Sequence, residues 1–230
     1  MKELNALITE GPSKEQPGLS RRKFMQYSSL AGLGLILASC EKNEDPAPGA
    51  EEGINLGEGD AGILNFHYAV EQVLAEFFSR VADNPYSGIT EREKNYFEDI
   101  KAHQLAHREI LKSVLGHRSI GLLTIRIDHI SYNTRLEVLG MAMKFKEISI
   151  SAYNGSLPLL SHYEHVQLLA KMASVASRHA SFIRETIQSG SFMDGSDAQG
   201  MDKALTPADV IVALRPHIAE NLLIHQLPTR

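Results

Sequence analysis

Five polar residues occur where the sequence pattern predicts the apolar faces of helices: Glu71, Gln104, His107, Lys146 and His179. Each lies near the middle of a predicted long helix, among apolar residues spaced three and four positions apart. A charge buried there without a partner would cost several kcal/mol. We therefore expect these side chains to meet at one level of a helical core, which is where helical bundles place metal ions.

The elements that must position these residues are long helices. Apolar periodicity predicts helices near 60–83, 91–115, 134–154 and 161–188, and a shorter one near 207–220. The predicted apolar stripes run from Leu64 to Phe78, Phe97 to Val114, Leu136 to Tyr153 and His165 to Ile183. Four such stripes predict an all-α protein built as a four-helix bundle.

Capping signals support these helix boundaries. Threonine or serine precedes a glutamate by three residues at Thr90, Thr134 and Ser161, as in a capping box. We expect Asp60 to cap the first helix, and Thr206-Pro207 to open the last one. Glycines occur where the helices are expected to end, at Gly116, Gly155 and Gly190.

Composition excludes several classes of protein. The chain has 230 residues and a net charge of -5, and its basic residues form no stripe after residue 40, so we expect no nucleic-acid partner. The single cysteine, Cys40, permits neither an intramolecular disulfide nor a thiolate metal site. No apolar run reaches the roughly 18 residues of a membrane-spanning helix.

The N-terminal segment resembles an export signal for a lipoprotein. Arg21-Arg22 precede Phe24 and a short apolar stretch that ends in Leu37-Ala38-Ser39-Cys40. The paired arginines resemble the twin-arginine export motif, and the residues around Cys40 resemble a lipobox. We therefore expect a signal peptide over 1–40, export by the twin-arginine machinery, and a lipid on Cys40 that anchors the protein to a membrane of the cell envelope. Residues 41–59 are expected to form a flexible acidic tether, and 60–225 the helical domain.

Short motifs follow one another in a fixed order over most of 60–220: Leu64-Asn65-Phe66 before Glu71, His107 before Leu115-Gly116, Ser151-Ala152-Tyr153, Arg178-His179-Ala180 and Thr206-Pro207-Ala208. With these motifs in this order, the helical domain resembles the exported ferritin-like proteins related to desiccation-associated proteins. The resemblance implies a ferritin-like up-down four-helix bundle with a long crossover connection and a short C-terminal helix.

In this family the four helices supply carboxylates and two histidines to a pair of iron ions. Three positions match these ligands: Glu71, His107 and His179. Three others carry a different residue where the family has glutamate: Gln104, Lys146 and Ala176. Glu147 follows Lys146 directly, but one step along a helix turns a side chain by about 100° away. The resemblance therefore implies a degenerate di-iron site.

Two hypotheses follow for the polar cluster. In the first, Lys146 takes the electrostatic role of the metal and pairs with Glu71, no cofactor is bound, and the protein is a non-catalytic structural or binding protein of the envelope. A homo-oligomer or an envelope protein partner is compatible with this role. In the second, Glu71, His107 and His179, with His67 or His103, hold one iron, manganese or zinc ion. The protein would then be a metal-binding protein or a metal-dependent oxidase.

Overall fold

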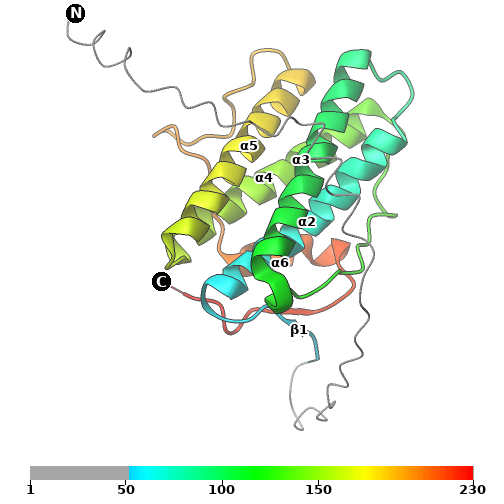
Figure 1. Cartoon of the computed structure of the whole chain (residues 1–230). Coiled ribbons are helices and arrows are strands. Elements are labelled where there is room, and N and C mark those ends of the chain that lie inside the picture. Colours follow the sequence, from blue (N-terminus) through cyan, green and yellow to red (C-terminus); the bar gives the residue numbers. More distant parts are fainter. Residues whose placement is uncertain (1–51, 230) are drawn as a thin grey trace, which may run out of the picture. The chain divides into compact units, whose positions relative to one another are not determined.

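The computed structural model describes residues 52–229, so Arg21, Arg22, Cys40 and most of the predicted tether lie outside the described residues. Four long helices follow one another: α2 (Gly59–Asp83), α3 (Glu91–Leu115), α4 (Arg135–Ser156) and α5 (Tyr163–Ile187). They lie side by side in Figure 1, and the short α6 (Pro207–Leu214) comes after them. The prediction of an all-α four-helix bundle with a short C-terminal helix is confirmed.

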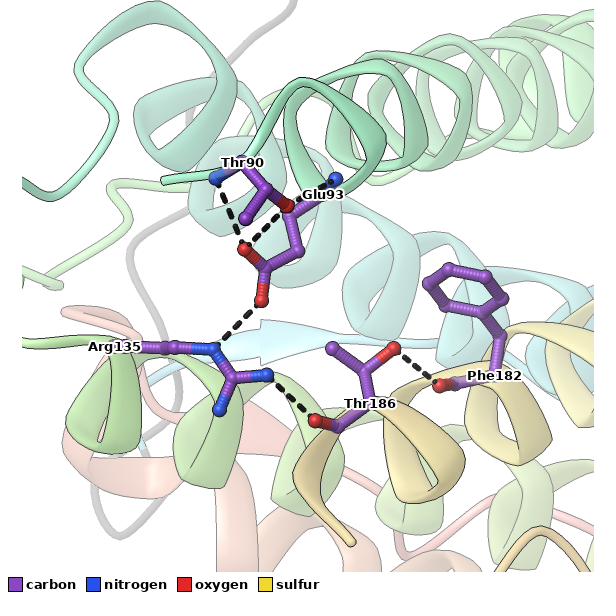
Figure 2. A network of polar contacts seen from close by, with 5 residues as sticks. All are labelled: Thr90, Glu93, Arg135, Phe182 and Thr186. Carbon is purple, nitrogen blue, oxygen red and sulfur yellow. Dashed lines mark hydrogen bonds and ion pairs between the residues drawn. The ribbon is translucent and has the colours of Figure 1, made fainter. Parts of the chain in front are cut away.

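A polar network joins three helices at one end of the bundle. Thr90 caps α3 and forms the predicted capping box with Glu93, and Thr134 forms the equivalent box at the start of α4. The Arg135 Nε atom donates to Glu93 Oε1 at 2.7 Å, and its Nη2 atom donates to the carbonyl of Thr186 near the end of α5 at 2.6 Å (Figure 2). The starts of α3 and α4 therefore lie beside the end of α5.

The opposite end of the bundle differs from the capping pattern predicted there. Asp60 does not cap its own helix, since the N-cap of α2 is Glu58. Its carboxylate instead accepts hydrogen bonds from the backbone N–H groups of Ser161 at 2.8 Å and His162 at 3.0 Å. Both N–H groups precede Tyr163, the first residue of α5, so Asp60 holds the segment that leads into this helix. The N-cap is His162, and Ser161 lies one residue too early to form the predicted box. Local sequence rules cannot foresee this contact from another helix.

Helix ends agree with the sequence only in part. Gly116 is the C-cap of α3, as predicted. Gly155 does not end α4, which continues to Ser156. A Cβ atom at Gly155 would lie 1.8 Å from the Leu205 carbonyl oxygen, so glycine here permits close approach of the chain that leads to α6. The last helix is shorter than predicted, because α6 gives way at Leu214 to a 3-10 turn, η3 (Arg215–His217).

Residues 119–134 cross from the end of α3 to the start of α4. Two buried amides of α2 hold the beginning of this crossover. The Asn65 Oδ1 atom accepts from the backbone of Ile120 at 3.1 Å, and Gln72 Oε1 accepts from the backbone of Leu123 at 2.7 Å. Gln72 also donates to the carbonyl of Gly121 at 3.1 Å. The long crossover lets α4 run parallel to α3, as in the predicted topology.

Two short strands were not predicted. β1 (Ile54–Asn55) pairs in parallel with β2 (Leu222–Leu223). The segment before the first long helix therefore pairs with a segment that follows the last helix. Two residues are too few for an alternating pattern to be visible in the sequence. Regular structure in the described part of the chain thus begins before residue 60, within the range predicted as a tether.

The core forms where the predicted stripes meet. α2 is buried over most of its surface, and its whole predicted stripe from Leu64 to Phe78 is inaccessible to solvent. Val114 and Leu136 are exceptions, because they are 39% and 73% exposed in the terminal turns of their helices. Leu115 takes the buried position in α3 instead of Val114. Within residues 52–229, none of the helices has the combined length and apolarity needed to cross a membrane.

Candidate functional site

Three of the five polar residues form a hydrogen-bonded chain in the centre of the bundle. Lys146 Nζ donates to Gln104 Oε1, and Gln104 Nε2 donates to Glu71 Oε2. These side chains come from α4, α3 and α2, and all three are essentially inaccessible to solvent. Lys146 and Glu71 were expected to pair, and the structure joins them through Gln104. We call these three residues the core network.

Tyr153 completes the surroundings of the carboxylate. Its hydroxyl donates to Glu71 Oε1 at 2.7 Å, so both oxygens of Glu71 accept hydrogen bonds. The sequence analysis placed Tyr153 at the end of the apolar stripe of α4, and periodicity alone does not show what its hydroxyl contacts. His67 stacks on the Tyr153 ring with 4.4 Å between ring centroids, and its Nε2 atom lies 2.6 Å from Ser156 Oγ. The Nε2 atom of His67 is therefore paired with Ser156 and not with the carboxylate.

The other two predicted cluster members lie at its edge. His107 Nδ1 is 3.8 Å from Glu71 Oε2, which is too long for a hydrogen bond. His179 Nε2 lies 3.0 Å from His103 Nδ1, so His179 is turned toward α3 and not toward Glu71. The Nδ1 atoms of both His107 and His179 are buried, and neither has a hydrogen-bond partner within the described part of the chain.

Burial and mutual charge set the protonation of the core network. Burial alone would raise the pKa of Glu71, but the contacts with His107, Lys146 and Tyr153 outweigh it and lower this pKa to about 2. Burial lowers the pKa of Lys146 to about 8, although Glu71 opposes the shift. The Lys146 ammonium also lies 4.9 Å from the centre of the Phe78 ring, a favourable cation–π distance. Near neutral pH the network holds one carboxylate and one ammonium.

Two buried histidines, His67 and His179, are neutral at neutral pH. Burial lowers the pKa of His67 to about 3. Burial, and after it the positive charge of Lys146, lowers the pKa of His179 to about 2. These imidazoles therefore add no positive charge to the core at neutral pH.

These residues do not fit a di-iron centre. Gln104 offers an amide where the centre needs a carboxylate, and the Lys146 ammonium cannot bind a metal while it is protonated. Ala176 is buried and carries no ligand atom. Glu147 is exposed as expected, and its carboxylate lies 3.6 Å from Arg184. One carboxylate thus remains of the four that the family uses.

A second cluster lies at the end of the bundle where α2 and α5 begin. His162 Nδ1 is 3.0 Å from Asp60 Oδ2, and His165 Nδ1 is 2.7 Å from the same oxygen. Within residues 52–229, this is the one group of three metal-ligand side chains whose ligand atoms all lie within 4.8 Å of one another. Glu71, His107 and His179 do not form such a group. The fold therefore brings together three candidate metal ligands that the sequence analysis did not predict.

Sequence reasoning did not place the two histidines of this cluster at a metal site. His162 was not among the candidate ligands, and its side chain is 68% exposed. His165 was expected on the apolar stripe of its helix, and its side chain is 21% exposed. His162 is the N-cap of α5 and His165 lies in its first turn, but their approach to Asp60, roughly a hundred residues earlier, depends on the tertiary fold.

Comparison with known protein families agrees with this architecture. Residues 59–189, more than half of the chain, match the ferritin-like domain family. The chain belongs to the ferritin-like domain family. The match begins with α2 and ends just beyond α5, so it covers all four long helices. The ferritin-like fold expected from the sequence motifs is thereby confirmed. No curated protein matches the chain.

Proposed function

We propose that this ferritin-like protein has replaced its di-iron centre with the core network and acts as a non-catalytic structural or binding protein of the cell envelope. The observation that carries the proposal is the buried chain from Lys146 through Gln104 to Glu71. It places a protonated amine where the family binds cations. The amine supplies the positive charge that balances the remaining carboxylate.

The network has the properties of a structural element. Its members come from three helices, and each polar atom of the Gln104 amide is used once, with Nε2 as donor and Oε1 as acceptor. A buried polar network with satisfied partners can fix the register of packed helices. A reactive centre would need access to a substrate, whereas Glu71, Gln104 and Lys146 are covered on all sides.

The proposed location follows from the N-terminal segment. Arg21-Arg22 and the residues around Cys40 support export through the twin-arginine route and acylation of the cysteine. An acylated cysteine would hold the ferritin-like domain at a membrane surface. There the domain would present its surface to an envelope partner or to further copies of itself. Cys40→Ser is expected to move the full chain from the membrane fraction to the soluble fraction, with the unaltered chain as reference.

Metal analysis tests the proposal for the core. The full chain carrying His162→Gln and His165→Gln, which removes the second cluster, is purified from its native envelope and measured for iron, manganese and zinc. We expect none of these metals in stoichiometric amount. One or two ions per chain in this variant would contradict the proposal and favour a metal centre at Glu71, His107 and His179.

A gain-of-binding variant tests the same idea from the other direction. Combining Gln104→Glu with Lys146→Glu supplies two carboxylates beside Glu71, and hard oxygen ligands favour iron and manganese. We expect the double variant to bind ferrous or manganous ions at least tenfold more tightly than the unaltered chain. Lys144→Glu makes the same lysine-to-glutamate change at an exposed position on the same helix, and is the control for the Lys146→Glu half of the double variant. Equal gains in both proteins would contradict the proposal.

A further inference from the structure

We propose that Asp60, His162 and His165 bind a single divalent transition-metal ion of the zinc class at the end of the bundle where α2 and α5 begin. The proposal concerns a different place from the core network and does not depend on the role assigned to that network. Two imidazole nitrogens and one carboxylate oxygen are a standard ligand set for zinc and related ions, and a water molecule can take the fourth position.

The contacts of one oxygen atom are the first support for the site. Asp60 Oδ2 lies 3.0 Å from His162 Nδ1, 2.7 Å from His165 Nδ1 and 3.0 Å from the backbone nitrogen of His162. Three nitrogen atoms at hydrogen-bond distance from this atom exceed the two lone pairs of a carboxylate oxygen. An ion bound by both imidazoles would use one lone pair and leave the other to the backbone N–H. A metal therefore satisfies these groups better than three competing hydrogen bonds do.

The cluster is also held in place for binding. The backbone N–H of Ser161 donates to Asp60 Oδ1 at 2.8 Å, which fixes the orientation of the carboxylate. Such outer contacts align the ligands of metal sites in proteins. Metal–ligand bonds of about 2.0–2.2 Å place neighbouring ligand atoms slightly more than 3 Å apart. Small rotations of the two histidine side chains would open the present contacts to that distance.

An ion can reach the cluster from solvent. An open pocket of about 740 Å³ adjoins it and is lined by Gly57, Glu58, Arg118 and the three ligand residues, among others. The lining includes one negative residue, Glu58, and one positive residue, Arg118. Their charges offset each other, so together they neither favour nor oppose the entry of a cation. The bound ion would join the first turn of α2 to the start of α5, and so link two helices that lie far apart in the sequence.

The proposal is tested by isothermal titration calorimetry, in which zinc is added to the full chain in detergent after a chelator has removed bound metal. We expect one zinc ion per chain, and at least tenfold weaker binding after His162→Gln or His165→Gln, since loss of even outer-shell contacts weakens metal sites 10–100-fold. His117→Gln, an exposed histidine in the η1 turn (Gly116–Arg118) at the same end of the bundle, is the matched control and should bind zinc as the unaltered chain does.

Three results would overturn the proposal: no zinc binding by the unaltered chain, equal binding by His165→Gln, or an equal loss in His117→Gln. Circular dichroism of each variant verifies that the helices remain folded. His162 is well exposed, so its replacement is expected to leave the fold intact. Zinc that is lost in Glu71→Gln but kept in His165→Gln would place the ion in the core. That result would contradict both this proposal and the proposed function, whereas loss in His165→Gln alone supports both.

Discussion

Neutralising the one carboxylate of the core network should destabilise the protein in a way that depends on pH. The change is Glu71→Gln, which keeps the shape of the side chain and removes its charge. The pKa of Glu71 falls from 4.5 to about 2 on folding. At about 1.4 kcal/mol per pKa unit, this charge contributes about 3 kcal/mol to stability at neutral pH. Breaking a buried ion pair costs a similar amount in other proteins, about 3–5 kcal/mol.

The sign of the pH dependence follows from Lys146. Its folded pKa of about 8 is below its ordinary value of 10.5, so the unfolded chain binds the proton more strongly and stability rises with pH between these two values. Without Glu71 the pKa of Lys146 in the folded protein falls further, so the pH range in which stability rises with pH begins below pH 8. From pH 7 to pH 8 the variant should therefore regain up to about 1 kcal/mol, and the unaltered protein much less.

Urea unfolding at pH 7 and pH 8, followed by circular dichroism, measures both effects. Glu147→Gln is the matched control, because this glutamate follows Lys146 on α4, is exposed, and faces Arg184 at 3.6 Å. We expect the control to lose less than about 1 kcal/mol, as surface ion pairs do. A loss below about 1 kcal/mol in Glu71→Gln, or a loss that is the same at both pH values, would refute the electrostatic role of the network.

Three further predictions concern stability. Below pH 4.5 the unaltered protein should lose the contribution of Glu71 as the pH falls toward 2, and an acid titration monitored by circular dichroism should show a smaller change for Glu71→Gln. Gly155→Ala should lower the free energy of unfolding by about 1–3 kcal/mol, because its Cβ would overlap the Leu205 carbonyl; an unchanged urea midpoint would contradict this. Thr90→Ala should cost about 1 kcal/mol through loss of the α3 cap, and Thr134→Ala at the start of α4 offers an independent comparison.

The sequence predicted the bundle well because its signal repeats over many turns. A stripe such as that from Leu64 to Phe78 is sampled several times at helical spacing, so a single exception changes little. The prediction was weaker at helix ends, where Val114 and Leu136 were assigned to the core. A terminal turn has fewer packing neighbours, and periodicity alone does not show where the neighbouring helices end.

The candidate sites were also predictable only in part. Glu71, Gln104 and Lys146 could be expected to meet because buried polar groups need partners and each lies midway along a helix. The rotation of His179 toward His103 could not be predicted, since both directions keep this histidine on the buried face. The cluster at Asp60 was missed because its carboxylate acts on a helix that begins roughly a hundred residues later, and capping rules read only neighbouring residues.

The charge balance of the core explains why one substitution should not restore a metal centre. Glu71 and Lys146 cancel each other, and His67 and His179 are neutral because burial holds their pKa values at about 3 and about 2. A dication added beside the Lys146 ammonium would be repelled in a medium of low dielectric constant.

Gln104→Glu alone would add a second carboxylate, and one of the two would be neutralised by a proton more readily than by a metal while Lys146 remains. We therefore expect the single variant to bind no stoichiometric iron or manganese, in contrast to the variant that also carries Lys146→Glu. Metal analysis of both proteins side by side measures this difference. Stoichiometric metal in Gln104→Glu alone would show that Lys146 does not exclude cations, and that the core network is a weaker barrier than its charges imply.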